Sequence, residues 1–195
     1  HYEANKSAYE IPERLETSIA FFPNTSYLNA SAEADESALR EHFISNRARF
    51  VADYEAANPQ PELTESEDTA EDAENTPKAP AVTFELVKDA VAADYSEKLA
   101  ADAANEAAQS FAFNLYDQAV ERDSAVFNTL LDNNGVTLQT VEPFSLDQAS
   151  QRGLPAEMLQ EAFSLGSNRF YTSVYPAKGG YGLLFTNGRI APETP

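Results

Sequence analysis

The residues from Val82 to about Arg122 contain neither glycine nor proline and are rich in alanine. Glycine and proline are the residues that most disfavour a helix interior, so this absence favours one long helix. Such a helix would span roughly 60 Å, at about 1.5 Å per residue. Because that length exceeds a small core, we expect part of it to reach another segment or a partner subunit. Its apolar residues recur every three or four positions and predict one stripe: Phe84, Val87, Val91, Tyr95, Leu99, Ala103, Ala107, Phe111 and Leu115.

The residues before this helix predict one strand and one shorter helix. The stretch RLETSIAFF, residues 14–22, alternates apolar and polar side chains and is limited by Pro12 and Pro23. Its period of two places Leu15, Thr17, Ile19 and Phe21 on one face. The stretch ADESALREHFISNRARFV, residues 34–51, predicts a single helix with Asp35 as its N-cap.

The last third of the chain changes to alternating short elements. A helix ending at Asn134-Gly135 is followed by a strand, VTLQTVEPF, and a helix, LPAEMLQEAFSLG. A β-hairpin with its turn at residues 178–180 then closes the chain. This order predicts an α+β fold, in which a small, mostly antiparallel sheet carries helices on one side and a helical insertion holds the long helix.

Charge and composition exclude several classes of partner. The chain has 195 residues, 32 of them acidic and 13 basic, for a net charge of −19. Nucleic acids and anionic membrane surfaces attract clusters of lysine and arginine, and this sequence has none, so we expect neither as a partner. It also lacks cysteine, which excludes disulfides, thiolate metal sites and a cysteine nucleophile.

Residues 55–80 are expected to form an exposed acidic linker. Between Glu62 and Asn75 there are seven carboxylates and no basic residue. Self-repulsion and the lack of apolar side chains favour a solvated segment. A calcium site is the alternative, but the D-x-D-x-D-G ligand spacing is missing.

The segment RGLPAEMLQEAFSLGSNRFYTSVYPAKGGYGLLFTNGRI resembles the closing third of the parvulin-type peptidyl-prolyl isomerases. In that family a G-x-M-x-x-x-F-x-x-A-x-F motif precedes a Gly-Tyr-His sequence in the last strand. Leu154 falls on the motif's methionine, Met158 on its first phenylalanine and Phe163 on its last. The resemblance implies that these three residues, with Tyr181, would bind a substrate proline, whereas ordinary core packing of an amphipathic helix is the alternative.

Other segments extend this resemblance. RLETSIAFF resembles the first strand of the family, and ALREHFISNRARF and VTFELVKDAVAADYSEKLAADAANEAA resemble helices of PpiD- and SurA-type periplasmic folding factors. The resemblance implies a parvulin-like domain built from residues 11–26 and 100–192 and split by a helical insertion, residues 27–99. The alternative is a chain with only helical flanks and a degenerate C-terminal copy of the domain.

The resemblance also implies that the catalytic floor has been lost. Parvulins carry two pocket histidines, which on this alignment fall at Ser18 and Gly182. No catalytic residue is therefore predicted, and the balance leans against an enzyme. His42 has no second histidine or cysteine at ligand spacing, so neither a metal site nor a cofactor is expected.

Together these features predict a non-catalytic, parvulin-like domain of a bacterial envelope chaperone. Its partners would be unfolded or proline-containing polypeptides, or a partner subunit, including a second copy of this chain. The resemblance implies a periplasmic or other extracytoplasmic location, with any membrane anchor lying upstream of residue 1. The alternatives are a weak peptidyl-prolyl cis-trans isomerase that uses only the apolar cup, and a purely structural dimerisation module.

Overall fold

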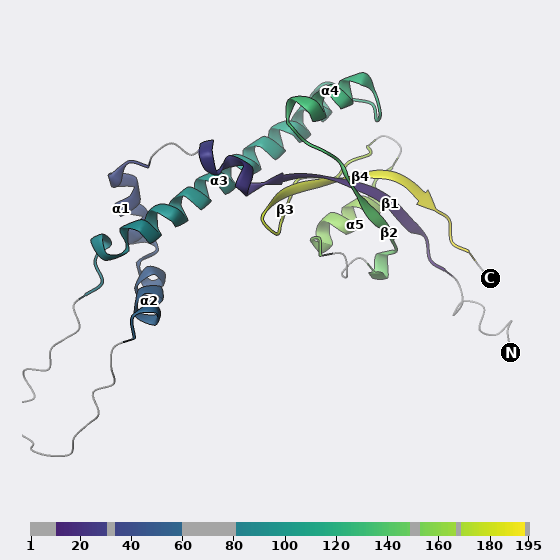
Figure 1. The fold of residues 1–195 in the computed structure, drawn as a ribbon. Helices are drawn as coiled ribbons and strands as arrows, with labels where there is room; N and C mark the ends of the chain where they lie inside the picture. The colour runs from purple at the N-terminus through teal and green to yellow at the C-terminus, as the bar shows by residue number, and fades with distance from the viewer. Residues whose placement is uncertain (1–10, 31–33, 60–80, 149–152, 167–168, 194–195) are drawn as a thin grey trace, which may run out of the picture. The chain divides into compact units, whose positions relative to one another are not determined.

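A computed structural model describes residues 11–30, 34–59, 81–148, 153–166 and 169–193 of the chain (Figure 1). The chain divides into two compact units, which are His1–Ala30 together with Leu99–Pro195, and Ser31–Lys98. The boundary between them falls inside helix α3, Phe84–Asp117. With 34 residues, α3 confirms the long helix that the absence of glycine and proline predicted.

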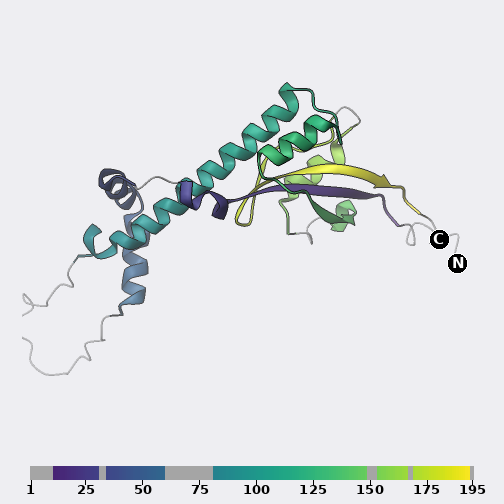
Figure 2. The ribbon, with the colours of Figure 1, turned by 45° about the horizontal axis from the view of Figure 1, so that its top comes forward.

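The first unit is built on a four-stranded antiparallel sheet with the order β2-β1-β4-β3. Strand β1, Arg14–Pro23, lies between β2, Gln139–Phe144, and β4, Gly180–Ile190. The edge strand β3, Tyr175–Ala177, pairs with the start of β4 and forms the predicted hairpin. In Figure 2, β1 and β4 run side by side through the centre of the sheet. A 3-10 helix, η2, Asn24–Ala30, follows β1.

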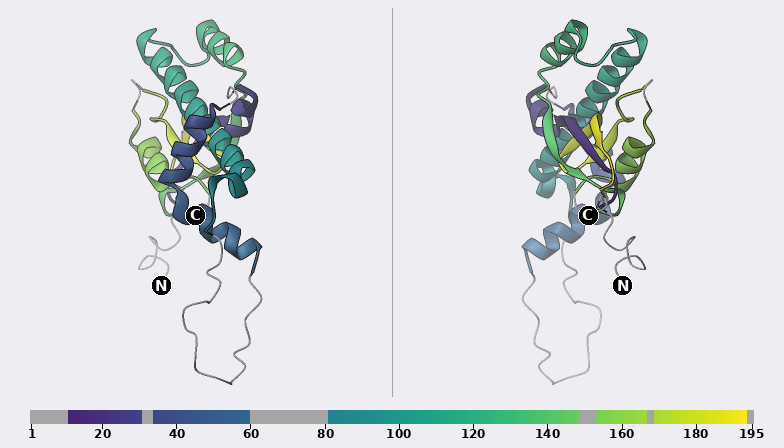
Figure 3. Two further views of the ribbon diagram at one scale, coloured as in Figure 1. Left: turned by 90° about the vertical axis from the view of Figure 1, so that its left-hand side faces the viewer. Right: turned by 90° about the vertical axis from the view of Figure 1, so that its right-hand side faces the viewer.

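The predicted α+β class is confirmed, but the expectation of helices on one side of the sheet is wrong. The C-terminal part of α3 and helix α4, Ala125–Asn133, cover one face, and helix α5, Ala156–Ser164, covers the other (Figures 1 and 3). The reason lies in β4, where Leu183 and Leu184 are consecutive and both fully buried. Consecutive strand residues point to opposite faces, so this sheet needs cover on both.

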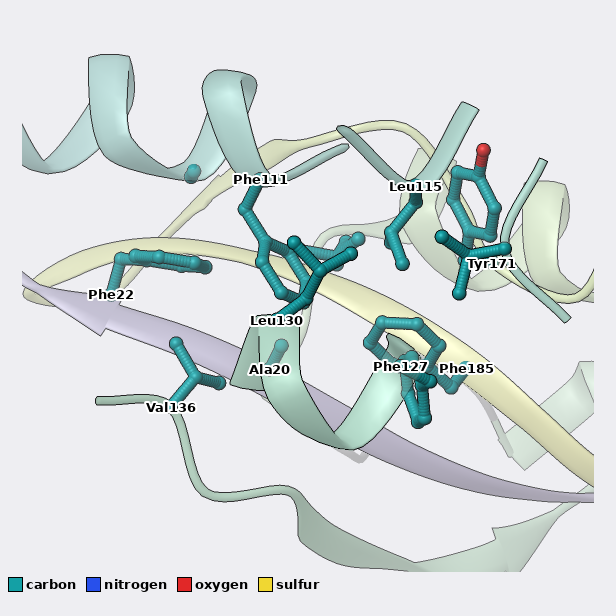
Figure 4. Packing of buried hydrophobic residues seen from close by; sticks show 12 residues of the cluster. Ala20, Phe22, Phe111, Leu115, Phe127, Leu130, Val136, Tyr171 and Phe185 are labelled. Carbon is teal, nitrogen blue, oxygen red and sulfur yellow. The ribbon is translucent and has the colours of Figure 1, made fainter. Parts of the chain in front are cut away.

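Two apolar clusters result, one on each face of the sheet. The α3/α4 cluster is rich in aromatic rings, and Figure 4 shows Phe111 of α3 and Leu130 of α4 pointing toward one another above β1. It contains Ala20, Phe22, Ala108, Phe111, Leu115, Val120, Phe127, Leu130, Val136, Tyr171, Leu183 and Phe185. The smaller α5 cluster contains Leu15, Ile19, Phe144, Met158, Leu159, Ala162 and Leu184.

Local signals fix where these elements begin and end. The Ser124 hydroxyl caps α4 by accepting a hydrogen bond from the backbone N–H of Phe127 at 3.1 Å. Gly135, with φ of +62°, follows the end of α4, as the Asn-Gly pair predicted. The hairpin between β3 and β4 turns at Gly179, whose φ of +82° favours glycine.

The second unit contains helices α1, Glu36–Ser45, and α2, Arg47–Ala57, and the N-terminal part of α3. The single helix predicted over residues 34–51 is wrong, because the chain bends at Asn46, whose side-chain amide donates a hydrogen bond to the carbonyl of His42 at 2.9 Å. The expected Asp35 N-cap is confirmed. The core of this unit comprises Leu39, Phe43, Phe50, Val82, Phe84, Val87 and Val91.

An acidic linker was expected from residue 55, but residues 55–57 form the last turn of α2, so this part of the prediction is wrong. From residue 60 to residue 80 this prediction lies outside the described residues. Among the helices that the structure describes, none combines the length and the apolar character needed to cross a bilayer.

Candidate functional site

The three residues of the expected proline cup do meet in space, but inside the α5 cluster. Met158 has no exposed surface, and Leu154 and Phe163 pack partly buried beside it. The Phe163 ring contacts the Phe144 ring of β2 edge-to-face, with 5.7 Å between centroids. These contacts are those of ordinary core packing. In this conformation Met158 has no surface with which to touch a substrate.

Tyr181 lies apart from the cup, since it packs against the α3/α4 cluster on the other face of the sheet. The sheet therefore separates it from Met158 and Phe163. The four residues expected to bind substrate do not form one site.

The two positions expected to correspond to pocket histidines also lie on opposite faces. A Cβ added to Gly182 would lie 3.1 Å from Cδ1 of Ile19, a member of the α5 cluster. Ser18, one residue earlier in β1, points to the α3/α4 face, where its hydroxyl accepts a hydrogen bond from the side-chain amide of Asn187 at 2.7 Å. Gly182 pairs with Phe21 of β1, and the side chain that occupies the space beside it is that of Ile19, not that of Ser18.

Ser18 instead begins a polar network that fixes Arg122. Asn187 Oδ1 accepts a hydrogen bond from the Arg122 guanidinium at 2.6 Å, and the carbonyl of Thr186 accepts another from it. Asp123 lies 3.4 Å from Arg122 Nε. Arg122 follows α3 in a short segment with unusual backbone geometry, because Ala119 and Asp123 both have positive φ, at 45° and 58°. Such conformations persist only where surrounding contacts hold them.

An open hollow of about 620 Å³ lies beside this segment, within the first unit. We call it the arginine-tyrosine hollow. Its walls combine apolar and aromatic surface with two guanidinium groups, and its lining consists of Leu115, Tyr116, Ala119, Val120, Glu121, Arg122, Arg169, Phe170 and Tyr171.

Exposed aromatic side chains continue from the hollow along α3. Tyr116 is 78% exposed, and Phe113, three residues earlier on the same helix, is 61% exposed. Positions three apart are neighbours on a helix surface, so the two rings form one aromatic patch. Exposed aromatic residues beside an apolar hollow are typical of interaction surfaces.

On the other wall of the hollow, Arg169 is held in place by neighbouring side chains. Arg169 stacks over the Tyr171 ring, 5.2 Å from its centroid, and lies 3.3 Å from the Glu161 carboxylate. Burial raises the pKa of the Tyr171 phenol. The phenol is therefore protonated at neutral pH and remains a hydrogen-bond donor.

Sequence reasoning missed this hollow, although one signal for it was present. Phe113 and Tyr116 are large aromatic residues that fall off the predicted apolar stripe, whose last members are Phe111 and Leu115. A helix that carries aromatic side chains outside its buried stripe exposes them. The position of Arg122 depends on the turn after α3 and carried no such signal.

His42, in the second unit, has structural partners. Its Nε2 lies 2.6 Å from Asp94 Oδ2, and its ring packs edge-to-face against Phe50 and Tyr95. Arg49 donates a hydrogen bond to the same carboxylate at 2.5 Å. That hydrogen bond, together with a weaker effect of His42, lowers the pKa of the Asp94 carboxyl against the opposing effect of burial. Among the described residues no three histidine or carboxylate side chains are grouped as metal ligands would be.

The fold and the hollow define an α+β protein whose open site combines aromatic side chains with two arginines. Comparisons with protein-family models, with curated proteins and with solved structures found no match for this chain.

Proposed function

We propose that this chain is a non-catalytic, parvulin-like module of a bacterial envelope folding factor and that it binds unfolded or extended polypeptide. The observation that carries the binding proposal is the arginine-tyrosine hollow with its exposed neighbours Phe113 and Tyr116. An unfolded client exposes aromatic and aliphatic side chains, and an open hollow with aromatic walls can take them without a fixed sequence. The parvulin-like assignment and the location outside the cytoplasm rest on the sequence resemblance.

Two features of the α5 side of the sheet support binding rather than isomerisation. Met158 is fully buried, and the space that a side chain at Gly182 would need is occupied by Ile19. Rotation about an X-Pro bond faces a barrier of about 18–20 kcal/mol, and lowering it requires groups that touch the twisted amide. A protease-coupled assay with an X-Pro peptide tests this part of the proposal, because substantial turnover would contradict it.

Binding is tested by titrating the protein with a fluorescent, permanently unfolded, proline-containing polypeptide. We expect saturable binding and chemical-shift changes at Tyr116, Phe170 and Tyr171. The double variant Phe113→Ser/Tyr116→Ser should bind roughly tenfold more weakly, since buried aromatic anchors dominate binding energy. The matched control is Ile44→Ser, which removes a side chain that is 72% exposed in the other unit and should leave binding unchanged.

Two outcomes would overturn the proposal. The first is the absence of binding, or shift changes confined to residues outside the hollow and the aromatic patch. The second is concentration-dependent dimerisation in light scattering that Phe113→Ser/Tyr116→Ser abolishes, because the patch would then serve a second copy of this chain. A monomer that binds the unfolded polypeptide supports the proposal.

A further inference from the structure

We infer that the arginine-tyrosine hollow selects polypeptide segments in which an aspartate or glutamate adjoins an aromatic or large aliphatic residue. This inference rests on the proposed function and adds the chemistry of the ligand. The apolar walls would take the aromatic or aliphatic side chain, while Arg122 and Arg169 would bind the carboxylate.

The distribution of charge supports an acidic ligand at this place. The described residues of the first unit include 13 carboxylate side chains and five cationic ones. Two of those five cations, Arg122 and Arg169, line this one hollow together with one carboxylate, Glu121, while Asp123 and Glu161 lie 3.4 Å and 3.3 Å from the two guanidinium groups. The hollow therefore concentrates cationic side chains on an otherwise acidic unit, and a ligand carboxylate would compete with Asp123 and Glu161 for them.

Arg122 is fixed in position and still has hydrogen-bond donors to offer. One terminal nitrogen of its guanidinium donates to Thr186 and the other to Asn187, and each carries a second N–H. The side chain is 31% exposed, so part of the group faces solvent. A guanidinium already held by two acceptors loses little conformational entropy when it binds a carboxylate.

Arg169 and Tyr171 provide the second half of the recognition. Arg169 is 47% exposed, and its stacking on the Tyr171 ring holds it at the wall. The Tyr171 phenol, protonated at neutral pH, can donate a further hydrogen bond. Charge-assisted hydrogen bonds to a carboxylate are roughly twice as strong as neutral ones.

The overall charge of −19 limits what kind of anion can approach. A nucleic acid or another polyanion would be repelled along most of its length, because long-range repulsion acts on every charge. One carboxylate within an apolar segment has little charge to repel and also gains apolar burial. The geometry therefore favours an acidic-apolar peptide over a polyphosphate.

The test uses three fluorescein-labelled peptides of equal length that share an apolar and aromatic core. One carries a central glutamate, the second a glutamine and the third a lysine at that position. Fluorescence anisotropy with the full chain should rank them Glu, then Gln, then Lys, with the Glu peptide roughly five- to tenfold tighter than the Gln peptide. Raising the salt concentration should reduce that preference.

Variants locate the preference. Arg122→Gln and Arg169→Gln should each reduce the binding of the Glu peptide severalfold more than the binding of the Gln peptide. Lys178→Gln, which removes an exposed cation at the β3–β4 turn, is the matched control and should change neither. Because Arg122 also contacts the backbone of β4, circular dichroism checks its fold, and Arg169→Gln alone suffices if that variant unfolds.

The outcomes separate this inference from the proposed function. Equal affinity for the Glu and Gln peptides, with the unfolded polypeptide still bound, overturns the inference and leaves the proposed function standing. A preference for glutamate that survives Arg122→Gln and Arg169→Gln also overturns it. Absence of binding to the peptides and to the unfolded polypeptide alike overturns the proposed function itself.

Discussion

Gly180, at the start of β4, is the glycine of this strand with the least room for a side chain. A Cβ at this position would lie 2.2 Å from the carbonyl oxygen of Phe22 and 2.9 Å from Cζ of Phe21. Phe22 belongs to β1, and its neighbour Pro23 is the residue that pairs with Gly180. Gly180→Ala can therefore be accommodated only if the two central strands move apart.

The size of the effect follows from three contributions. Overpacking a well-packed site costs about 1–3 kcal/mol. Distorting the end of the β1–β4 ladder weakens one or two hydrogen bonds, each worth about 1 kcal/mol. Alanine returns about 0.4–1 kcal/mol by restricting the unfolded chain. We expect a net loss of roughly 3 kcal/mol, which for a chain of this size lowers Tm by about 6–12 °C.

Two other glycines of β4 serve as graded controls. At Gly182 an added Cβ would lie 3.1 Å from the Ala20 carbonyl oxygen and from Ile19 Cδ1, so Gly182→Ala should lose only about 1 kcal/mol. At Gly188 the near atom, at 2.7 Å, is Oε2 of Glu16, the end of a side chain that can rotate away. Gly188→Ala should therefore be neutral or up to about 1 kcal/mol more stable.

The assay must report on the first unit alone, because a chain with two compact units need not unfold in one step. Native-state hydrogen exchange of the peptides that cover β1 and β4 meets this need, and urea unfolding followed by circular dichroism complements it. The three variants should rank, from the most to the least stable, Gly188→Ala, Gly182→Ala and Gly180→Ala. If Gly180→Ala is as stable as Gly188→Ala, the close approach of β4 to β1 at Phe22 is refuted.

Three further substitutions test a core side chain, a buried hydroxyl and an ion pair. Met158→Ala should destabilise the first unit by about 2–5 kcal/mol without weakening peptide binding to the folded protein, whereas a binding residue would show the reverse. Thr17→Val should be neutral or stabilise by about 1 kcal/mol in urea unfolding, because among the described residues the buried Thr17 hydroxyl has no hydrogen-bond partner. For Asp94, whose folded pKa lies below its unfolded value of about 3.9, stabilisation by Arg49 is present above about pH 5 and is lost as the pH falls. Asp94→Asn should therefore destabilise the second unit by roughly 1 kcal/mol at neutral pH, and this difference should shrink between about pH 5 and pH 2. A difference that does not change with pH would contradict the pairing of Asp94 with Arg49.

Local chemistry made much of the fold predictable. The absence of glycine and proline predicted α3, the two prolines limited β1, and Asn134-Gly135 ended α4. Each of these signals acts within a few residues of the feature it determines. The single helix expected over residues 34–51 was wrong for the same reason, since propensity did not show that Asn46 would bond the preceding turn.

Tertiary features were less predictable, because they depend on which surfaces meet. The sequence showed that Leu183, Leu184 and Phe185 form an apolar run. It did not show that helices would cover both faces of the sheet, because that depends on which face α5 packs against. The alignment placed lost histidines at Ser18 and Gly182, but Gly182 packs beside Ile19, which the period of two in β1 places on the face opposite to Ser18. Of the two signals, the strand alternation agrees with the structure.

The packing at Gly182 explains why the proposed binding belongs on the α3/α4 side of the sheet. On the α5 side, Ile19 fills the space next to Gly182, and Met158 and Leu184 close the layer beneath α5. Met158 and Leu184 are fully buried there and offer no surface to a ligand. On the opposite face, the left-handed turn at Ala119 ends α3 early enough to leave Tyr116 and Arg122 at the rim of a hollow.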